Sequence, residues 1–347
     1  MNSVFKNELF SGSRLFRDFQ KRPWGFIDIG ARGGFSEIPQ PVAGITAVMG
    51  FEPDAGESAR MQKELEENSP WAQIAIHAAG LSDKEGPAKL HCFNQSTNDS
   101  LLPPNPLYTE RYKMEKWKLE RIVEIQATTL DQVLAKSYSS ETFWGEFLKI
   151  DTQGTEYQIL RGAEKTLRER TVAIATEVEF FELYKGQKLF SDLEIYLRGL
   201  GFSFYGFMDL HSRSLKQLDK RKENGNERAF FANAVFLKDP FSLADGRKDG
   251  NERGSQVLFL SALMLGYFDF ALEIVSKTWV ENDPPEARRL SALVHELARS
   301  EPKESAAEVE ALAQKIRKNP DEAPVLMGKL VDRHRFDGDY FSIPDPS

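Results

Sequence analysis

The pattern that most constrains the fold is an alternation of short apolar runs with longer amphipathic segments. Each short run is followed within a few residues by a glycine or an acidic residue; the runs cover 26–29, 47–51, 74–76, 147–150 and 172–175. Helical periodicity fills the intervals between them, for example over 55–65 and 155–168. Because strands that alternate with helices form crossover units, we expect an α/β fold around a parallel sheet.

The pattern changes after residue 177. A helical segment at 191–200 precedes two apolar runs, 201–207 and 230–237, which we expect to pair as antiparallel strands across a polar loop at 211–228. A stretch rich in glycine and charged residues follows, and the chain from 257 to 335 has a helical pattern. The predicted organisation is a lead segment (1–22), an α/β domain (23–240), a linker (241–256) and a small helical domain (257–347), which stabilises the fold or forms a dimer interface.

Composition excludes several classes of protein. With 45 basic and 53 acidic residues among 347, the chain has a net charge of −8, which argues against a nucleic-acid partner. A single cysteine, Cys92, excludes an internal disulfide and a thiolate zinc cluster, as is typical of a reducing compartment. The most apolar stretch, 257–268, is too short for a membrane span, and charged residues interrupt any secretory signal at the N-terminus. We therefore expect a soluble, cytoplasmic protein.

A glycine turn and a later acid suggest a nucleoside cofactor. The turn at 28–34 places glycine at 30 but Arg32 and Phe35 where the nicotinamide fingerprint needs glycine. Glu52 follows the second strand, where a carboxylate can bind a ribose diol. This combination suits S-adenosylmethionine, with Asp28 on its ammonium group, directly or through water, and the backbone of 30–34 beside its amino-acid end. The alternative is an ordinary strand-to-helix turn with a surface acid.

The segment 148–164 is the most specific sequence motif. It reads Leu-Lys-Ile-Asp-Thr-Gln-Gly-Thr-Glu-Tyr-Gln-Ile-Leu-Arg-Gly-Ala-Glu, and it closely resembles the signature of FkbM-type methyltransferases. Further elements of that family occur in the expected order, at 28–31, 51–53, 80–83, 100–101, 129–131, 177–180, 184–187 and 201–202. The resemblance extends from about residue 26 to 237 and does not include the helical tail. This chain departs from the usual motif at 32–34 and at 152–153.

The resemblance implies a Rossmann-like, class I methyltransferase fold, with a seven-stranded sheet whose last strand is antiparallel. It implies S-adenosylmethionine as methyl donor and a hydroxyl of a sugar, glycan or related small molecule as acceptor. On this basis, the predicted cofactor-binding residues lie in the first turn, after the second strand and near the third strand: Asp28, Gly30, Ala31, Arg32, Gly33, Glu52, Pro53, Ser82 and Asp83.

Methylation of a hydroxyl also requires removal of its proton, by a general base or with the help of a metal. Asp151 follows the fourth strand and Glu177 the fifth, at the sheet edge where parallel sheets bind ligands. The two carboxylates could hold Mg²⁺ or Mn²⁺ together. Alternatively, one of them or His211 acts directly as the base, and Asp151 could instead only cap the next helix.

Three other predictions stay open from the sequence. The segment 94–118 is either a lid or binding loop, or a variable surface loop. The helical tail could support a homo-oligomer. Two other functions compete with the transferase: a non-catalytic methyltransferase-like module that docks a partner through the tail, and a nicotinamide oxidoreductase, which the incomplete glycine fingerprint disfavours.

Overall fold

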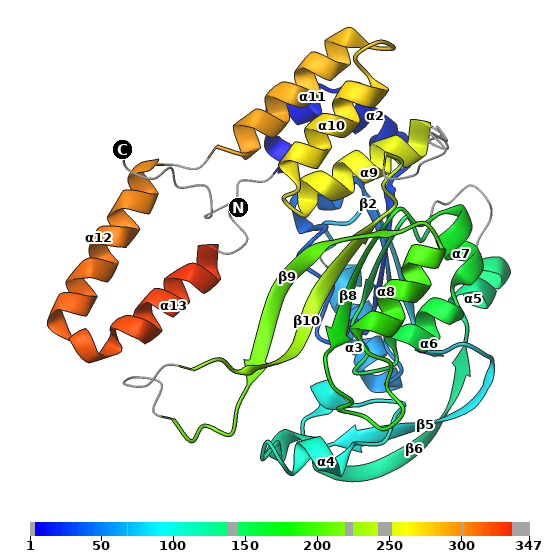
Figure 1. Ribbon diagram of the computed structural model, residues 1–347. Coiled ribbons are helices and arrows are strands. Elements are labelled where there is room, and N and C mark those ends of the chain that lie inside the picture. The colour runs from blue at the N-terminus through cyan, green and yellow to red at the C-terminus, as the bar shows by residue number, and fades with distance from the viewer. Residues whose placement is uncertain are drawn as a thin grey trace.

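The computed structural model describes residues 4–67, 69–137, 144–218, 225–241, 252–299 and 302–334. Its main sheet has seven strands in the order β3-β2-β1-β7-β8-β10-β9 (Figure 1). The strands are β1 (Trp24–Ile29), β2 (Thr46–Phe51), β3 (Gln73–His77), β7 (Phe147–Ile150), β8 (Ala173–Glu179), β9 (Ser203–Arg213) and β10 (Arg228–Leu237). Only β10 runs antiparallel to its neighbours, β8 and β9. The predicted class I methyltransferase sheet is thus confirmed.

Alternating residues of these strands build two hydrophobic cores. Ile27, Met49 and Leu148 point into one core, which helices on that face of the sheet complete. Helices on this side include α5 (Leu130–Ser137), α6 (Glu156–Arg161), α7 (Glu164–Glu169) and α8 (Phe190–Gly199), while α3 (Ala55–Glu67) connects β2 to β3. The residues next to Ile27 and Leu148 in sequence, Phe26 and Phe147, point into the other core. Both faces of the sheet are therefore covered, as parallel strands require.

The second core joins the two ends of the chain. It contains the N-terminal helices α1 (Glu8–Ser11) and α2 (Arg14–Lys21) and the later helices α9 (Glu252–Met264), α10 (Phe268–Thr278) and α11 (Pro284–Leu297). Helix α9 begins at Glu252, inside the segment 241–256 that the sequence assigned to a linker, and residues 242–251 lie outside the described part. Helices α9, α10 and α11 share one core with the sheet (Figure 1). The division of the chain into a lead segment, an α/β domain, a linker and a helical domain remains a prediction.

The last two helices, α12 (Pro302–Lys318) and α13 (Ala323–His334), form a hairpin with the short turn η5 (Pro320–Glu322) between them. Figure 1 shows this hairpin away from the sheet. Its residues do not belong to the core that α9 to α11 share with the sheet, whose C-terminal contributors end at Leu297. In the described ranges, every helix is too short or too polar to cross a lipid bilayer.

A second, three-stranded sheet lies near the carboxyl ends of the main strands, and the sequence did not predict it. Its order is β4-β6-β5, with β4 (Gly80–Leu81), β5 (Gly86–Phe93) and β6 (Leu119–Thr128). The segment between β5 and β6 holds η3 (Ser96–Asn98), α4 (Pro106–Thr109) and η4 (Glu115–Trp117). The remaining 3-10 turns are η1 (Val4–Lys6) and η2 (Gln40–Ile45).

Two boundaries differ from the sequence prediction. Strand β8 continues through Glu179, so Glu177 lies within the strand and does not follow it. Strand β9 continues through Arg213, so His211 lies in a strand, although the sequence placed it in the polar loop.

Candidate functional site

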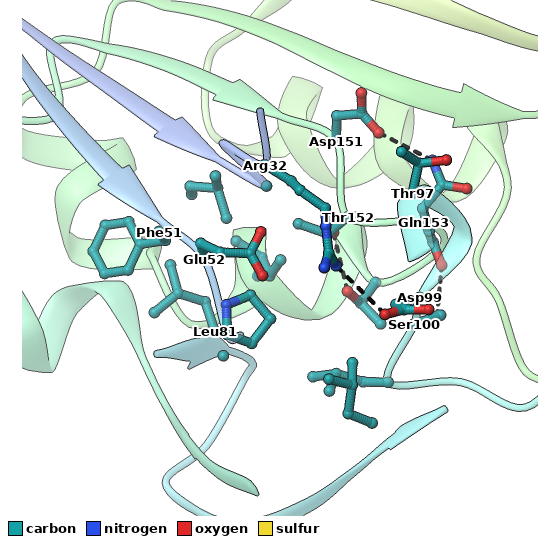
Figure 2. Close-up of a pocket in the computed structure, with 18 of the residues that line it drawn as sticks. Arg32, Phe51, Glu52, Leu81, Thr97, Asp99, Ser100, Asp151, Thr152 and Gln153 are labelled. Atoms are coloured by element: carbon teal, nitrogen blue, oxygen red, sulfur yellow. Dashed lines mark hydrogen bonds and ion pairs between the residues drawn. The ribbon is translucent and has the colours of Figure 1, made fainter. Parts of the chain in front are cut away.

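A pocket of about 290 Å³ lies where β1, β2 and β7 end. Its walls come from the turns after these strands, from the region of β4, and from the segment 96–101 (Figure 2). Of the residues that the sequence assigned to a site, five line this pocket: Gly30, Arg32, Glu52, Pro53 and Asp151. The fold therefore brings three separate sequence motifs together at one place.

Gly30 allows the ends of β1 and β7 to approach each other closely. Its φ angle is +86°, and a Cβ atom at this position would lie 1.9 Å from the carbonyl oxygen of Asp151. The backbone N–H of Asp151 donates to the carbonyl of Ile29 at 3.0 Å. A side chain at residue 30 would therefore push apart the two turns that form the pocket floor.

Asp28 lies beneath this floor and outside the pocket lining. Its Oδ2 accepts a hydrogen bond from the backbone N–H of Ser36 at 2.7 Å, and its Oδ1 lies 3.4 Å from Lys149 Nζ. Burial raises the pKa of Asp28, while Lys149 acts in the opposite direction. The carboxylate holds the turn after β1 against β7, so the structure places Asp28 where it supports the pocket.

Glu52 is the most buried carboxylate of the pocket lining, with 3% of its surface exposed. Its Oε1 accepts a hydrogen bond from the backbone N–H of Asp54 at 2.8 Å. Burial raises its pKa, whereas this hydrogen bond and the charge of Arg32 lower it. The apolar side chains of Pro53, Leu81 and Leu90 also line the pocket. A buried acid beside apolar walls can bind a diol next to a flat ring.

Arg32 extends across the pocket from the turn after β1 (Figure 2). Its Nη1 donates to the carbonyl of Ser96 at 3.2 Å and lies 3.4 Å from Asp99 Oδ2. Its Nη2 lies 3.7 Å from Asp54 Oδ2. The guanidinium thus connects the turn after β1 to the segment 96–101 and to Asp54, which follows β2.

Asp151 receives a contact on each of its carboxylate oxygens. Lys149 Nζ lies 3.5 Å from Oδ2, and the side-chain amide of Gln153 donates to Oδ1 at 3.1 Å. The same amide nitrogen donates to Oε1 of Glu177 at 3.2 Å. Gln153 adopts a left-handed backbone conformation, with φ of +59°, which is uncommon for a residue other than glycine. This conformation directs one amide toward two carboxylates.

Glu177 lies behind the pocket wall and outside its lining. Burial, followed by the charge of Asp151, raises the pKa of Glu177 well above its ordinary value. Its partner Gln153 stands between it and Asp151, where a shared cation would have to bind. Among the described residues, no group of three or more His, Cys, Asp or Glu side chains is arranged to hold a metal ion. The predicted divalent-cation site is therefore not supported.

Five other predicted residues lie outside the lining. The ring of His211 stacks on Phe231 with 4.2 Å between ring centroids, and its Nε2 lies 3.6 Å from Asp209 Oδ2. Gly33 donates its N–H to Glu57, Ala31 is buried, and Ser82 donates to its neighbour, Asp83. The structure does not bring these residues to the same pocket.

Sequence reasoning missed several lining residues, including Asn98 and Ser100. The segment 94–118 was predicted as either a lid or a surface loop, and its portion 96–101 forms a pocket wall. Ser100 Oγ donates to the carbonyl of Gln153 at 2.6 Å, which attaches this wall to the turn after β7. The aromatic residues further along, Tyr112 and Trp117, pack instead around the buried Tyr184. The family motif at 100–101 was the available signal.

The family model of the methyltransferase FkbM domain matches residues 28–204. Among solved structures, the chain is similar to methyltransferase FkbM from Methylobacillus flagellatus KT, with 15% identity and a TM-score of 0.36. This match covers 62% of this chain and 43% of that one, so it spans less than half of that protein.

Two further solved structures are similar to this chain. One is magnesium protoporphyrin IX methyltransferase from Synechocystis PCC 6803, with 8% identity, a TM-score of 0.31 and coverage of 65% of this chain and 74% of that one. The other is Sp1610 from Streptococcus pneumoniae, a putative tRNA (m1A22) methyltransferase, with 11% identity and a TM-score of 0.32. This match covers 82% of this chain and 98% of that one. No curated protein matches the chain.

Proposed function

Because this chain belongs to the methyltransferase FkbM domain family, we propose that it transfers a methyl group from S-adenosylmethionine to a hydroxyl of a sugar, glycan or related small molecule. The observation that carries this proposal is one pocket lined by both the buried Glu52 and the more accessible Asp151. Glu52, after β2, provides a place for a nucleoside, and Asp151 provides a carboxylate at the carboxyl end of β7, on the other side of β1.

The residues of the pocket have the chemistry that this cofactor requires. Glu52 would accept hydrogen bonds from the ribose hydroxyls, and the apolar surface of Pro53, Leu81 and Leu90 would contact the adenine ring. S-adenosylmethionine supplies a methyl group that is activated by its bond to a positively charged sulfur. Asp28, which the sequence assigned to the ammonium group, is already paired with Lys149 and Ser36, so we assign it the support of the turn.

Asp151 is our candidate for the general base. Its carboxylate would take the proton of the acceptor hydroxyl, while Lys149 and Gln153 hold it in position. Positioning of this kind keeps the base within hydrogen-bond distance of the reacting oxygen. We assign no cation to Asp151 and Glu177, because the amide of Gln153 already joins them. We assign His211 no role as the base, because it lies outside the pocket lining.

Calorimetric titration with S-adenosylhomocysteine, the demethylated product, tests the cofactor assignment. The purified protein is expected to bind this compound and not NAD⁺, and Glu52→Ala should weaken binding about tenfold or more because charged hydrogen bonds are lost. Arg60→Ala is the matched control, since Arg60 is a surface residue that pairs with Glu57 and Glu64 on α3. Unchanged affinity in Glu52→Ala would contradict the ribose assignment, and binding of NAD⁺ instead would favour the oxidoreductase. A protein that binds neither compound would favour the non-catalytic module.

A further inference from the structure

We propose that Arg32 recognises the carboxylate of the cofactor's amino-acid moiety. Arg32 would thereby select ligands that carry this moiety over nucleosides that lack it. This inference rests on the proposed function, because it names the part of the proposed cofactor that Arg32 binds. The sequence motif places Arg32 among the cofactor-binding residues but does not say which group of the cofactor it contacts.

The charges of the pocket lining are the first argument. Three acids line the pocket, namely Glu52, Asp99 and Asp151, and Arg32 is the one basic side chain in that lining among the described residues. Lys149 lies behind the floor, between Asp28 and Asp151. The three acids would repel a ligand carboxylate, and the positive charge of Arg32 would offset this repulsion.

The contacts of Arg32 are the second argument. Its three polar contacts, with Ser96, Asp99 and Asp54, measure 3.2, 3.4 and 3.7 Å. Charge-assisted hydrogen bonds are shorter than this, usually about 2.7–2.9 Å. Arg253 in the same molecule forms two such bonds with one carboxylate, at 2.6 and 2.7 Å. The planar guanidinium of Arg32 therefore lacks the two-pronged partner that a carboxylate provides.

The third argument is that the neighbouring wall is held in place without Arg32. Asp99 accepts a hydrogen bond from the N–H of Phe93 at 2.8 Å through its other oxygen, Oδ1. Asn98 donates to the carbonyl of Lys116 at 2.9 Å, and Ser100 donates to the carbonyl of Gln153 at 2.6 Å. Because these bonds fix the segment 96–101, loss of the weak contacts of Arg32 should leave the pocket wall intact.

Two ligands separate recognition of the carboxylate from a general effect on the pocket. S-adenosylhomocysteine carries the amino-acid moiety, and 5′-methylthioadenosine keeps the adenosine and the sulfur but lacks that moiety. We expect Arg32→Gln to weaken binding of S-adenosylhomocysteine about tenfold or more, as expected for the loss of charge-assisted hydrogen bonds. Binding of 5′-methylthioadenosine should change less than about twofold, and this second ligand also reports that the variant is folded. Arg32→Lys should fall between the wild type and Arg32→Gln, because lysine keeps the charge and loses the planar fork.

Two controls complete the experiment. Glu52→Ala should weaken binding of both ligands, since both contain the ribose, and Arg60→Gln should affect neither. Equal losses for both ligands in Arg32→Gln would overturn the inference and make Arg32 a residue that shapes the pocket. Unchanged binding of both ligands would also overturn it, while leaving the proposed function in place. If the wild-type protein bound neither ligand, the proposed function and this inference would both fail.

Discussion

Replacement of Arg253 by methionine tests whether α9 is an integral part of the α/β fold. Arg253, in the first turn of α9, forms two hydrogen bonds with Glu146, at 2.6 Å from Nε and 2.7 Å from Nη2. It also donates to the carbonyls of Arg22 and Pro23, at 2.9 Å each. The side chain of Glu146 is only 4% exposed, and its Oε2 also accepts a hydrogen bond from the N–H of Gly25. One residue thus connects α9, the start of β1 and the start of β7.

The size of the effect follows from the burial of Glu146. Removal of one partner of a buried ion pair typically costs about 3–5 kcal/mol, because the other charge stays buried without its partner. A domain is stable by only about 5–15 kcal/mol, so this loss is a large fraction of the total. Methionine keeps much of the apolar volume of arginine, and the loss therefore reports mainly on the ion pair. Urea unfolding followed by tryptophan fluorescence should show a clearly lower midpoint.

The dependence on pH provides a second measurement. Burial raises the pKa of Glu146, and Arg253 lowers it, so loss of Arg253 should raise this pKa further. A carboxyl whose pKa is raised in the folded state binds protons more readily there than in the unfolded chain, and the folded state loses stability as the pH rises through that pKa. The difference between Arg253→Met and wild type should therefore be largest near pH 7 and shrink on acidification toward the pKa of the unfolded carboxyl.

A double-mutant cycle completes the test. Glu146→Gln should rescue part of the loss in Arg253→Met, since the double variant buries no unpaired charge. If Arg253→Met cost less than about 1 kcal/mol, the pair would behave as an exposed salt bridge. That result would refute our view that α9 is fixed to the sheet at this point.

Two further perturbations address the limits of the fold and the chemistry of the site. Removal of 300–347 should leave the melting temperature nearly unchanged, whereas a chain that ends at 238 should aggregate during gel filtration because Trp24 and Phe26 lose the helices that cover them; a stable, monomeric 1–238 fragment would contradict the shared core. Asp151→Asn should lower the methyl-transfer rate by about 10²–10⁴-fold, as for loss of a general base, with little change in cofactor affinity. A wild-type rate in this variant would remove Asp151 from the mechanism, and a rate that requires added Mg²⁺ would contradict the role given to Gln153.

The sheet could be predicted from the sequence because its signals are local. Each main strand is an apolar run, and Gly30, Glu52 and Asp151 each follow one directly. Parallel strands end at the same edge of a sheet, and these three residues line one pocket. The family resemblance added the number of strands and the antiparallel last strand.

Other features depend on partners that the sequence does not display. Asp28 resembled a ligand-binding acid, but the register of the sheet places it directly beside Lys149 on β7. The strand β6 was not predicted, although residues 123–128 alternate between apolar and polar types; in the structure most of its residues are exposed. The position of α9 did leave a signal: residues 257–263 are all buried, and a helix that is apolar on every side belongs inside a protein.

The charged side chains at the two ends of the main sheet differ in how completely other residues of the chain fill their hydrogen-bonding capacity. Near the start of β7, Glu146 has short hydrogen bonds to both of its oxygens, and Arg253 has a partner for each of its guanidinium nitrogens. At the carboxyl end, Asp54 alone among the described residues donates to the side chain of Glu52, and the contacts of Arg32 are long. Buried polar groups need partners, so a buried charge whose capacity is unfilled implies a partner outside the chain. By this criterion Glu146 and Arg253 hold the fold together, while the buried Glu52 keeps hydrogen-bonding capacity for the cofactor that we propose.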